Sequence, residues 1–371
     1  MKKPLTPRDT QPPAGSSSAS CAATLLAGFG GGSTPRIVAV PAVINIRNAM
    51  MAPMPDSSAT KRKAIPPGLG LGWVALGLAA LVFVQFKGIP AWTAIPIAAA
   101  FLVEFPFYLS PSAEWSRIRN PWLLAGSCLL PYLVYSVPTG LFRVESLALL
   151  AGLALLLSMW FRVQPKGWLT DYLYLALVAA VLLSKVFDQI YPTPIPKLGV
   201  STLGHLMLIR TSATALLVLR GGITAEYRFL PTWREWRNGV KWSLPMAATS
   251  LIALRLLGLW TPKAHPNLWA AVPQFLGILW VVTLSEEFIF RGVLQNWLEE
   301  ATRNRWAALA VTSIVFGSAH LGFHGAFPNW RFAIVATVFG LWCGLAWRES
   351  RSVPTSMVAH AIAATLYRVF F

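Results

Sequence analysis

Long apolar stretches recur along the chain after about residue 65, and this feature constrains the fold more than any other. Several reach about 18 residues, which a helix needs to cross a hydrocarbon layer about 30 Å thick. The chain is 55% hydrophobic and 12% charged, whereas soluble domains are about 25% charged. We therefore predict an all-α fold, a polytopic transmembrane helical bundle. About eleven spans are expected, within a range of eight to eleven: 69–86, 91–109, 122–137, 144–161, 168–189, 200–220, 242–260, 268–298, 306–322, 330–347 and 353–371.

The net charge of +17 arises mainly in the polar leader and in short segments between these stretches. When alternating spans are followed along the chain, sixteen Lys and Arg fall on the side of Lys61, Arg62 and Lys63, against six on the other side. Because basic residues concentrate on the cytoplasmic side, this predicts a cytoplasmic N-terminus. We expect a multi-pass protein of a bacterial inner (plasma) membrane, with the lipid bilayer and no nucleic acid among its partners.

The chain divides into three parts by composition. Residues 1–64 are rich in Pro, Ser, Gly and Ala, which predicts a disordered extension. A translation start at Met50, Met51 or Met54 is an equally simple explanation of it. Residues 65–267 then supply additional transmembrane helices, and 268–371 form a C-terminal core in which Gly340 and Gly344 predict close approach of two helices. Three cysteines without metal-ligand spacing exclude a disulfide scaffold and a zinc finger.

Ionisable residues inside the predicted spans are costly, by about 2.5 to 3.5 kcal/mol each, and are functional candidates by default. Several have structural explanations. Arg210 can extend its guanidinium to the membrane surface or pair with a carboxylate elsewhere, and Glu104 and Arg255 are expected in interhelical pairs. Asp171 lies where a helix cap is expected, and Lys185 can pair with Asp188 one turn away. The full set is Glu104, Asp171, Lys185, Asp188, Arg210, Arg255, Glu286, Glu287, Arg291, His320 and His360.

The sequence from Ser285 to Arg291 places two adjacent carboxylates and one guanidinium in an apolar helix. At about 100° per residue, Glu287 and Arg291 lie only about 40° apart on one helix face. We therefore predict that Glu287, not Glu286, contacts Arg291. Glu286 is not matched by that pair, which leaves its carboxylate available as a general base. The alternative is a purely structural salt bridge in this helix.

Two histidines follow in later apolar segments, His320 and His360. Either one alone is more often a satisfied interior histidine than a catalyst. Together with Glu286 they can hold one water or one metal ion, and we predict that the three side chains converge on one point. His205 and His265 belong to no such cluster, and we assign His324 to a loop.

The order Glu-Glu-x-x-x-Arg, Phe-x-x-x-His and a final helical His resembles the CPBP family (CAAX protease and bacteriocin-processing, or Abi) of intramembrane endopeptidases, over about 268–371. The resemblance implies an intramembrane bundle with a cavity open to the cytoplasm. It implies that Glu286 is the general base for a water, with His320 as its partner. It further implies that Glu287 and Arg291 orient the first motif and that His360 stabilises the oxyanion.

The chain departs from the family pattern at one position. The family usually has Asn or Asp four residues after the last histidine, and this chain has Ala364. That change removes a hydrogen-bond donor or leaves a neighbour such as Thr365 to replace it. The family has also been regarded as metal-dependent, so Glu286, His320 and His360 are candidate ligands of a zinc ion, and a reaction without a cofactor is the alternative.

These features predict an intramembrane endopeptidase that cleaves a membrane-associated peptide or protein. A catalytically inactive scaffold or partner-binding protein of the same fold is the alternative, which Ala364 favours. A transporter is a third hypothesis, but the inverted repeat that many carriers show is not evident in the sequence.

Overall fold

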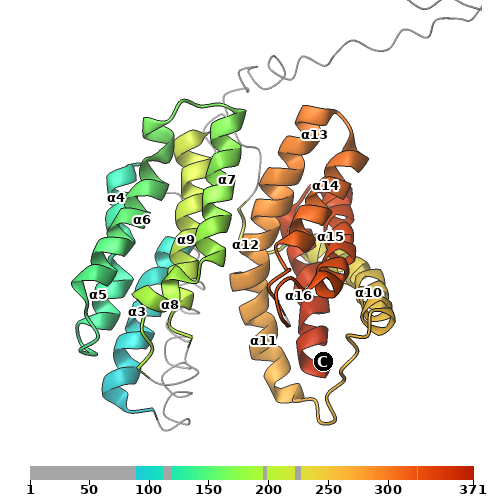
Figure 1. Ribbon diagram of the computed structural model, residues 1–371, viewed down its shortest axis with the longest axis horizontal. Coiled ribbons are helices and arrows are strands. Elements are labelled where there is room, and N and C mark those ends of the chain that lie inside the picture. Colours follow the sequence, from blue (N-terminus) through green and yellow to red (C-terminus); the bar gives the residue numbers. More distant parts are fainter. Residues whose placement is uncertain (1–88, 112–117, 195–198, 222–226, 324) are drawn as a thin grey trace, which may run out of the picture. The chain divides into compact units, whose positions relative to one another are not determined.

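The computed structural model of the protein describes residues 89–111, 118–194, 199–221, 227–323 and 325–371. Within these ranges every regular element is a helix (Figure 1), which confirms the predicted all-α class. The predicted extension over 1–64 and the first predicted span, 69–86, lie outside the described residues.

A first group of helices precedes residue 222. Its core contains large apolar and aromatic side chains that are fully buried, such as Leu157, Tyr132 and Tyr174. Its elements are α3 (Ala91–Leu109), α4 (Pro121–Ser127), α5 (Leu130–Ser136), α6 (Val144–Val163), α7 (Trp168–Leu183), α8 (Val186–Ile190), α9 (Thr202–Thr214) and the π-helix η1 (Ala215–Arg220).

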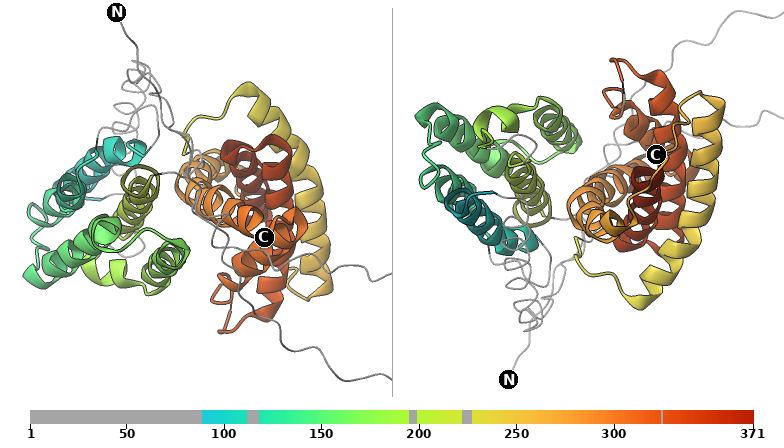
Figure 2. Two further views of the ribbon diagram at one scale, coloured as in Figure 1. Left: turned by 90° about the horizontal axis from the view of Figure 1, so that it is seen from above. Right: turned by 90° about the horizontal axis from the view of Figure 1, so that it is seen from below.

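A second group contains the motifs described above. The long helix α10 packs along both α15 and α16, as the views in Figure 2 show. The elements are α10 (Trp233–Leu256), η2 (Leu268–Ala270), α11 (Ala271–Gly277), η3 (Ile278–Thr283), α12 (Leu284–Glu287), η4 (Phe288–Gln295), α13 (Asn296–Thr302), α14 (Arg305–Ser318), α15 (Trp330–Ser350) and α16 (Val353–Phe370).

Among the described residues, four helical stretches are long and apolar enough to cross a membrane: 91–109, 144–163, 202–220 and 330–350. Each coincides with a predicted span. Two other predicted spans are interrupted. The stretch 122–137 divides into α4 and α5, because Pro131 has no N–H for the carbonyl of Ser127. The stretch 168–189 breaks at Lys185, whose left-handed φ of 56° cannot continue a helix. The total of eleven spans and the cytoplasmic N-terminus stay predictions.

A buried ion pair joins α3 to α9. Glu104 and Arg210 are both completely buried, and the Arg210 guanidinium donates to the Glu104 carboxylate. Arg210 also donates from Nη1 to Ser127 Oγ at 2.9 Å, and it lies 4.9 Å from the centre of the Phe107 ring. Of the two explanations for Arg210, pairing with a carboxylate elsewhere is the one that the structure confirms, and the expected interhelical pairing of Glu104 is the same contact.

Candidate active site

The two adjacent glutamates lie on a single α-helical turn, α12, between two π-helical segments, η3 and η4. A π-helix bonds residue i to i+5, so side chains advance around its axis by a different angle than in an α-helix, and such segments are frequent at functional sites. The predicted α-helical geometry therefore does not hold beyond Glu287. Arg291 nevertheless stays within reach of Glu287, because four residues still make about one turn of the helix.

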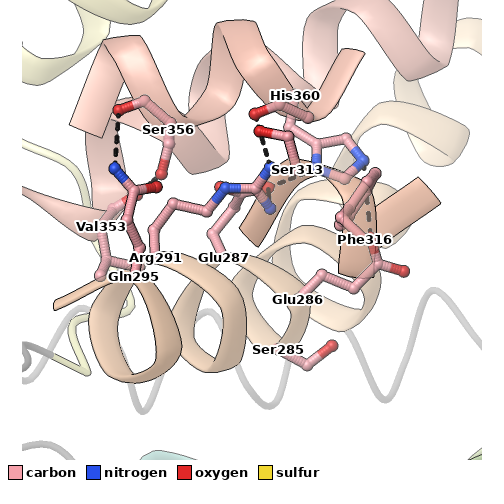
Figure 3. Close-up of polar contacts among 12 residues, drawn as sticks. Ser285, Glu286, Glu287, Arg291, Gln295, Ser313, Phe316, Val353, Ser356 and His360 are labelled. Carbon is pink, nitrogen blue, oxygen red and sulfur yellow. Dashed lines mark hydrogen bonds and ion pairs between the residues drawn. The ribbon is translucent and has the colours of Figure 1, made fainter. Parts of the chain in front are cut away.

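Glu287 is completely buried and is shared by two partners (Figure 3). Its Oε1 accepts a hydrogen bond from Arg291 Nη1 at 3.2 Å and another from His360 Nδ1 at 2.7 Å. The predicted contact between Glu287 and Arg291 is confirmed. The contact with His360 was not predicted, and it links the helix that carries both glutamates to α16.

Arg291 is held by α14 and α15 as well as by Glu287. Its Nη2 donates to the carbonyl of Gly340 at 2.9 Å, and its guanidinium lies 4.6 Å from the centre of the Phe316 ring. A Cβ at Gly340 would lie 3.4 Å from Arg291 Nη2, and a Cβ at Gly344 would lie 2.3 Å from Leu309 Cδ1. The small residues on α15 therefore permit the close approach that the sequence predicted.

His360 has each ring nitrogen facing a different carboxylate. Because an ionised carboxylate can only accept, the 2.7 Å contact with Glu287 places the proton on Nδ1. Nε2 lies 3.8 Å from Glu286 Oε2, and the Phe339 ring packs edge-on against the imidazole at 4.7 Å between centroids. His360 is thus oriented on one side by Glu287, and it presents its other nitrogen to Glu286.

Glu286 differs from its neighbour in exposure and in partners. Its side chain is 25% exposed, against 0% for Glu287. Its Oε2 has no hydrogen-bond partner among the described residues, although His360 Nε2 is 3.8 Å away. Glu286, the glutamate for which the sequence predicted no cationic partner, is therefore the one that faces an open space.

That space is a cavity of about 480 Å³ bounded by α10, the helix of the glutamates, α14, α15 and α16. Its walls are mostly apolar and aromatic, and Ala364 is one of the wall residues. Its polar groups include Glu286, His320 and His360. The position at which the family usually has Asn or Asp therefore faces the same cavity as the predicted base.

His320 lies just beyond the end of α14 and lines this cavity. Its Nδ1 is 2.8 Å from the carbonyl of Phe316, and its ring packs beside Phe316 and Phe323. Among the described residues, Glu286 forms an ion-pair contact within 4.0 Å with His360 and forms none with His320. Of the three residues predicted to converge, two are close together and the third shares their cavity.

The predicted metal ligands can be compared with the donor atoms that come together. Among the described residues, the donors within 4.8 Å of one another at this site belong to Glu287, Cys343 and His360. Arg291 Nη1 lies 3.2 Å from the same Glu287 oxygen that His360 contacts, and a guanidinium so close opposes a divalent cation. These three residues fit a zinc ion poorly. The predicted set of Glu286, His320 and His360 stays a prediction.

Other ionisable residues have partners away from this site. Arg220 donates to both carboxylate oxygens of Asp171, at 3.0 and 2.6 Å. Asp171 is therefore in an ion pair and is not the expected cap, because the N-cap residue of α7 is Gly167. His205 Nδ1 lies 2.9 Å from the carbonyl of Ser201 on its own helix. His324 lies outside the described residues.

Sequence reasoning missed Phe339 and Cys343, which approach His360 from α15. Their places beside Gly340 and Gly344, the predicted site of close helix approach, were the available signal. It also missed Gln295, whose Nε2 lies 3.5 Å from the carbonyl of Gly344, one turn beyond the Arg291 contact.

The comparisons with known proteins agree with the geometry of this segment. Residues 267–366 match the family model of the type II CAAX prenyl endopeptidase Rce1-like proteins. The C-terminal segment is therefore similar to this family. The predicted relation to the CPBP and CAAX proteases is thereby confirmed for about a quarter of the chain, and the match includes both glutamates, Arg291, His320 and His360. The family is a protease family, which supports a peptidase, and the apolar helices fit an integral membrane protein. No curated protein and no solved structure matches the chain.

Replacing Glu287 in the Rce1-like segment should cost stability as well as activity. Glu287→Gln leaves the Arg291 guanidinium buried without a counter-charge, and removing one partner of a buried pair costs about 3–5 kcal/mol of the free energy of unfolding. The measurement is thermal unfolding of the purified protein in detergent. Glu286→Gln is the matched control, because Glu286 is partly exposed and has no arginine partner among the described residues. An equal loss of stability in both variants would contradict this account of Glu287.

Proposed function

We propose that the protein is an intramembrane endopeptidase that hydrolyses a peptide bond of a membrane-associated peptide or protein. The observation that carries the proposal is the 3.8 Å separation of Glu286 Oε2 and His360 Nε2 at the wall of a largely apolar cavity. The match of residues 267–366 to a protease family supports the same conclusion.

In the proposed reaction, Glu286 activates a water in the cavity that contacts both its carboxylate and His360. Glu286 accepts a proton as the water oxygen forms a bond to the peptide carbonyl carbon. The carbonyl oxygen becomes an oxyanion, and the proton then passes to the amide nitrogen as the C–N bond breaks. General base and acid catalysis of this kind contributes about 10²–10⁴-fold. The partly exposed carboxylate suits this exchange because it meets the cavity directly.

The proposed role of His360 is to stabilise the oxyanion. In the protonated ring, Nδ1 donates to Glu287 and Nε2 is directed at the reacting group. One well-placed donor of this type contributes about 10²–10³-fold. Glu287 and Arg291 act as positioning residues, because they hold the imidazole and do not face the cavity. His320 lines the cavity and supports the water in this proposal.

No step of this reaction depends on a metal ion. The family has been regarded as metal-dependent, and a zinc ion bound here would polarise the carbonyl and acidify the water. The donor set of Glu287, Cys343 and His360 fits such an ion poorly, because Arg291 shares the Glu287 oxygen. We assign proton transfer to Glu286 itself, and a zinc ion held by Glu286, His320 and His360 is the alternative.

A catalytically inactive scaffold or partner-binding protein of the same fold is the second candidate. The observation that favours it is Ala364, which lines the cavity four residues after His360. An alanine side chain supplies no hydrogen bond at a position where the related proteases usually have Asn or Asp. A scaffold would keep the fold without this group.

Replacing Glu286 tests the proposed base. Glu286→Gln preserves size and hydrogen bonding but removes the basic carboxylate, so cleavage should fall by about 10²–10⁴-fold while thermal stability changes little. The measurement is cleavage of a cognate substrate by the full chain in membranes, with expression monitored in parallel. Undiminished cleavage by Glu286→Gln would exclude Glu286 as the base.

Restoring the amide at position 364 separates an enzyme from a scaffold. Ala364→Asn adds a donor to the cavity wall, and turnover should rise by up to about 100-fold if that donor reaches the oxyanion. Ala364→Leu is the matched control, because it adds similar bulk without a polar group and should not raise turnover. If neither the parent nor Ala364→Asn cleaves any membrane peptide, the scaffold is the better description.

A further inference from the structure

The bundle of helices around the cavity has two ends, and contacts between the helices identify each of them. At one end, Lys241 near the start of α10 pairs with Glu349 near the end of α15 at 2.8 Å, and Arg351 contacts Glu299 at 2.7 Å. We call this the basic end. At the other end, the Lys263 N–H donates to the carbonyl of Phe370 at 2.8 Å. We call this the α16 C-terminal end.

The cavity occupies only the half of the bundle that faces the α16 C-terminal end. From α16 it is lined by His360 and later residues, and from α15 by Phe339 and earlier ones. The helix of the glutamates contributes Ile278, Val282 and Glu286, which lie in the half of that helix farther from the basic end. Each helix therefore lines the cavity from its middle to the same end.

Exposed residues mark where the cavity meets the outside. Lys263, Arg368 and Phe323 line it and are exposed, and all three lie at the α16 C-terminal end. Glu286 and His360 lie at the opposite, deeper part of the lining. The mouth of the cavity is therefore at the α16 C-terminal end.

Exposed tryptophans indicate that both ends of the bundle lie at membrane surfaces. Trp233 and Trp306 are 82% and 66% exposed at the basic end. Trp269 and Trp330 are 95% and 61% exposed at the α16 C-terminal end. Tryptophan is enriched at both interfaces of a bilayer. The two ends then lie on opposite sides of the membrane.

The basic residues differ in number between these ends, and the difference sets the orientation. Eight Lys and Arg lie at or near the basic end, against four at the other. Because Lys and Arg concentrate in short cytoplasmic segments, the basic end faces the cytoplasm. The eight are Arg228, Arg234, Arg237, Lys241, Arg303, Arg305, Arg348 and Arg351, and the four are Arg255, Lys263, Arg331 and Arg368.

We propose that the cavity opens on the non-cytoplasmic side of the membrane and receives an apolar peptide segment from that side. This rests on the proposed function for the nature of the occupant, but the direction of access rests only on the lining residues, the exposed tryptophans and the charge distribution. Aromatic and aliphatic walls suit an apolar segment, and Lys263 and Arg368 at the mouth disfavour a basic one. The proposed direction is opposite to the cytoplasmic opening that the family resemblance implies.

Labelling of single added cysteines with a membrane-impermeant maleimide tests the direction without any proteolysis. Arg368→Cys marks the mouth, and Arg305→Cys is the matched control at the basic end, because both are exposed arginines. Ala364→Cys reports from inside the cavity. Each full-length variant is labelled in spheroplasts and in inverted membrane vesicles. The parent chain, which contains Cys21 and the buried Cys128 and Cys343, gives the background that is subtracted from each variant.

The proposal requires Arg368→Cys and Ala364→Cys to react at least about tenfold faster in spheroplasts, and Arg305→Cys to react faster in inverted vesicles. The opposite pattern for the two arginine positions would overturn the orientation. Reaction of Ala364→Cys from the side of Arg305 would overturn the position of the mouth. If Arg368→Cys is not produced, His265→Cys in the exposed α10–α11 connection replaces it. None of these results depends on whether Glu286→Gln still cleaves a substrate, so failure of the two proposals is distinguishable.

Discussion

The carboxylate of Glu287, shared between Arg291 and His360, is the interaction on which the rest of the site depends. A buried guanidinium in an apolar bundle needs a counter-charge, and Glu287 supplies it from one helical turn away. The same oxygen accepts a hydrogen bond from His360 Nδ1 and so fixes the orientation of the ring that faces Glu286. One buried carboxylate thus stabilises the helix that carries both glutamates and orients a side chain from α16.

Adjacent residues with the same side chain have different environments because the helix turns between them. Glu287 points into the bundle and is completely buried, whereas Glu286 faces the cavity and is partly exposed. The sequence predicted this division, since Arg291 lies one turn from Glu287 and no cation matches Glu286. It could not predict that His360 bonds to Glu287, because that contact depends on how α16 is rotated against the helix of the glutamates. It also could not predict the π-helical segments on either side of α12, which carry no sequence mark here.

In the rest of the fold, long apolar runs predicted helices better than they predicted where helices break. The stretch that became α15 was predicted within a few residues, whereas Lys185 ended α7 in a run that reads as continuous. Local polar signals were similarly incomplete. The cost of burying Arg210 predicted a partner, but only the packing of α3 against α9 identifies Glu104. Contacts between distant segments are the part of the site and fold that one sequence leaves undetermined.

The central claim is that Glu287 holds the Nδ1 proton of His360 and leaves Nε2 facing Glu286. Solid-state nitrogen-15 NMR of histidine-labelled protein in bilayers tests it most directly, with His360→Gln used to assign the signal among the five histidines. The account predicts a protonated Nδ1 with the downfield proton shift of a strong hydrogen bond, which Glu287→Gln weakens and Glu286→Gln does not. A neutral His360 ring with its proton on Nε2 alone would contradict the account.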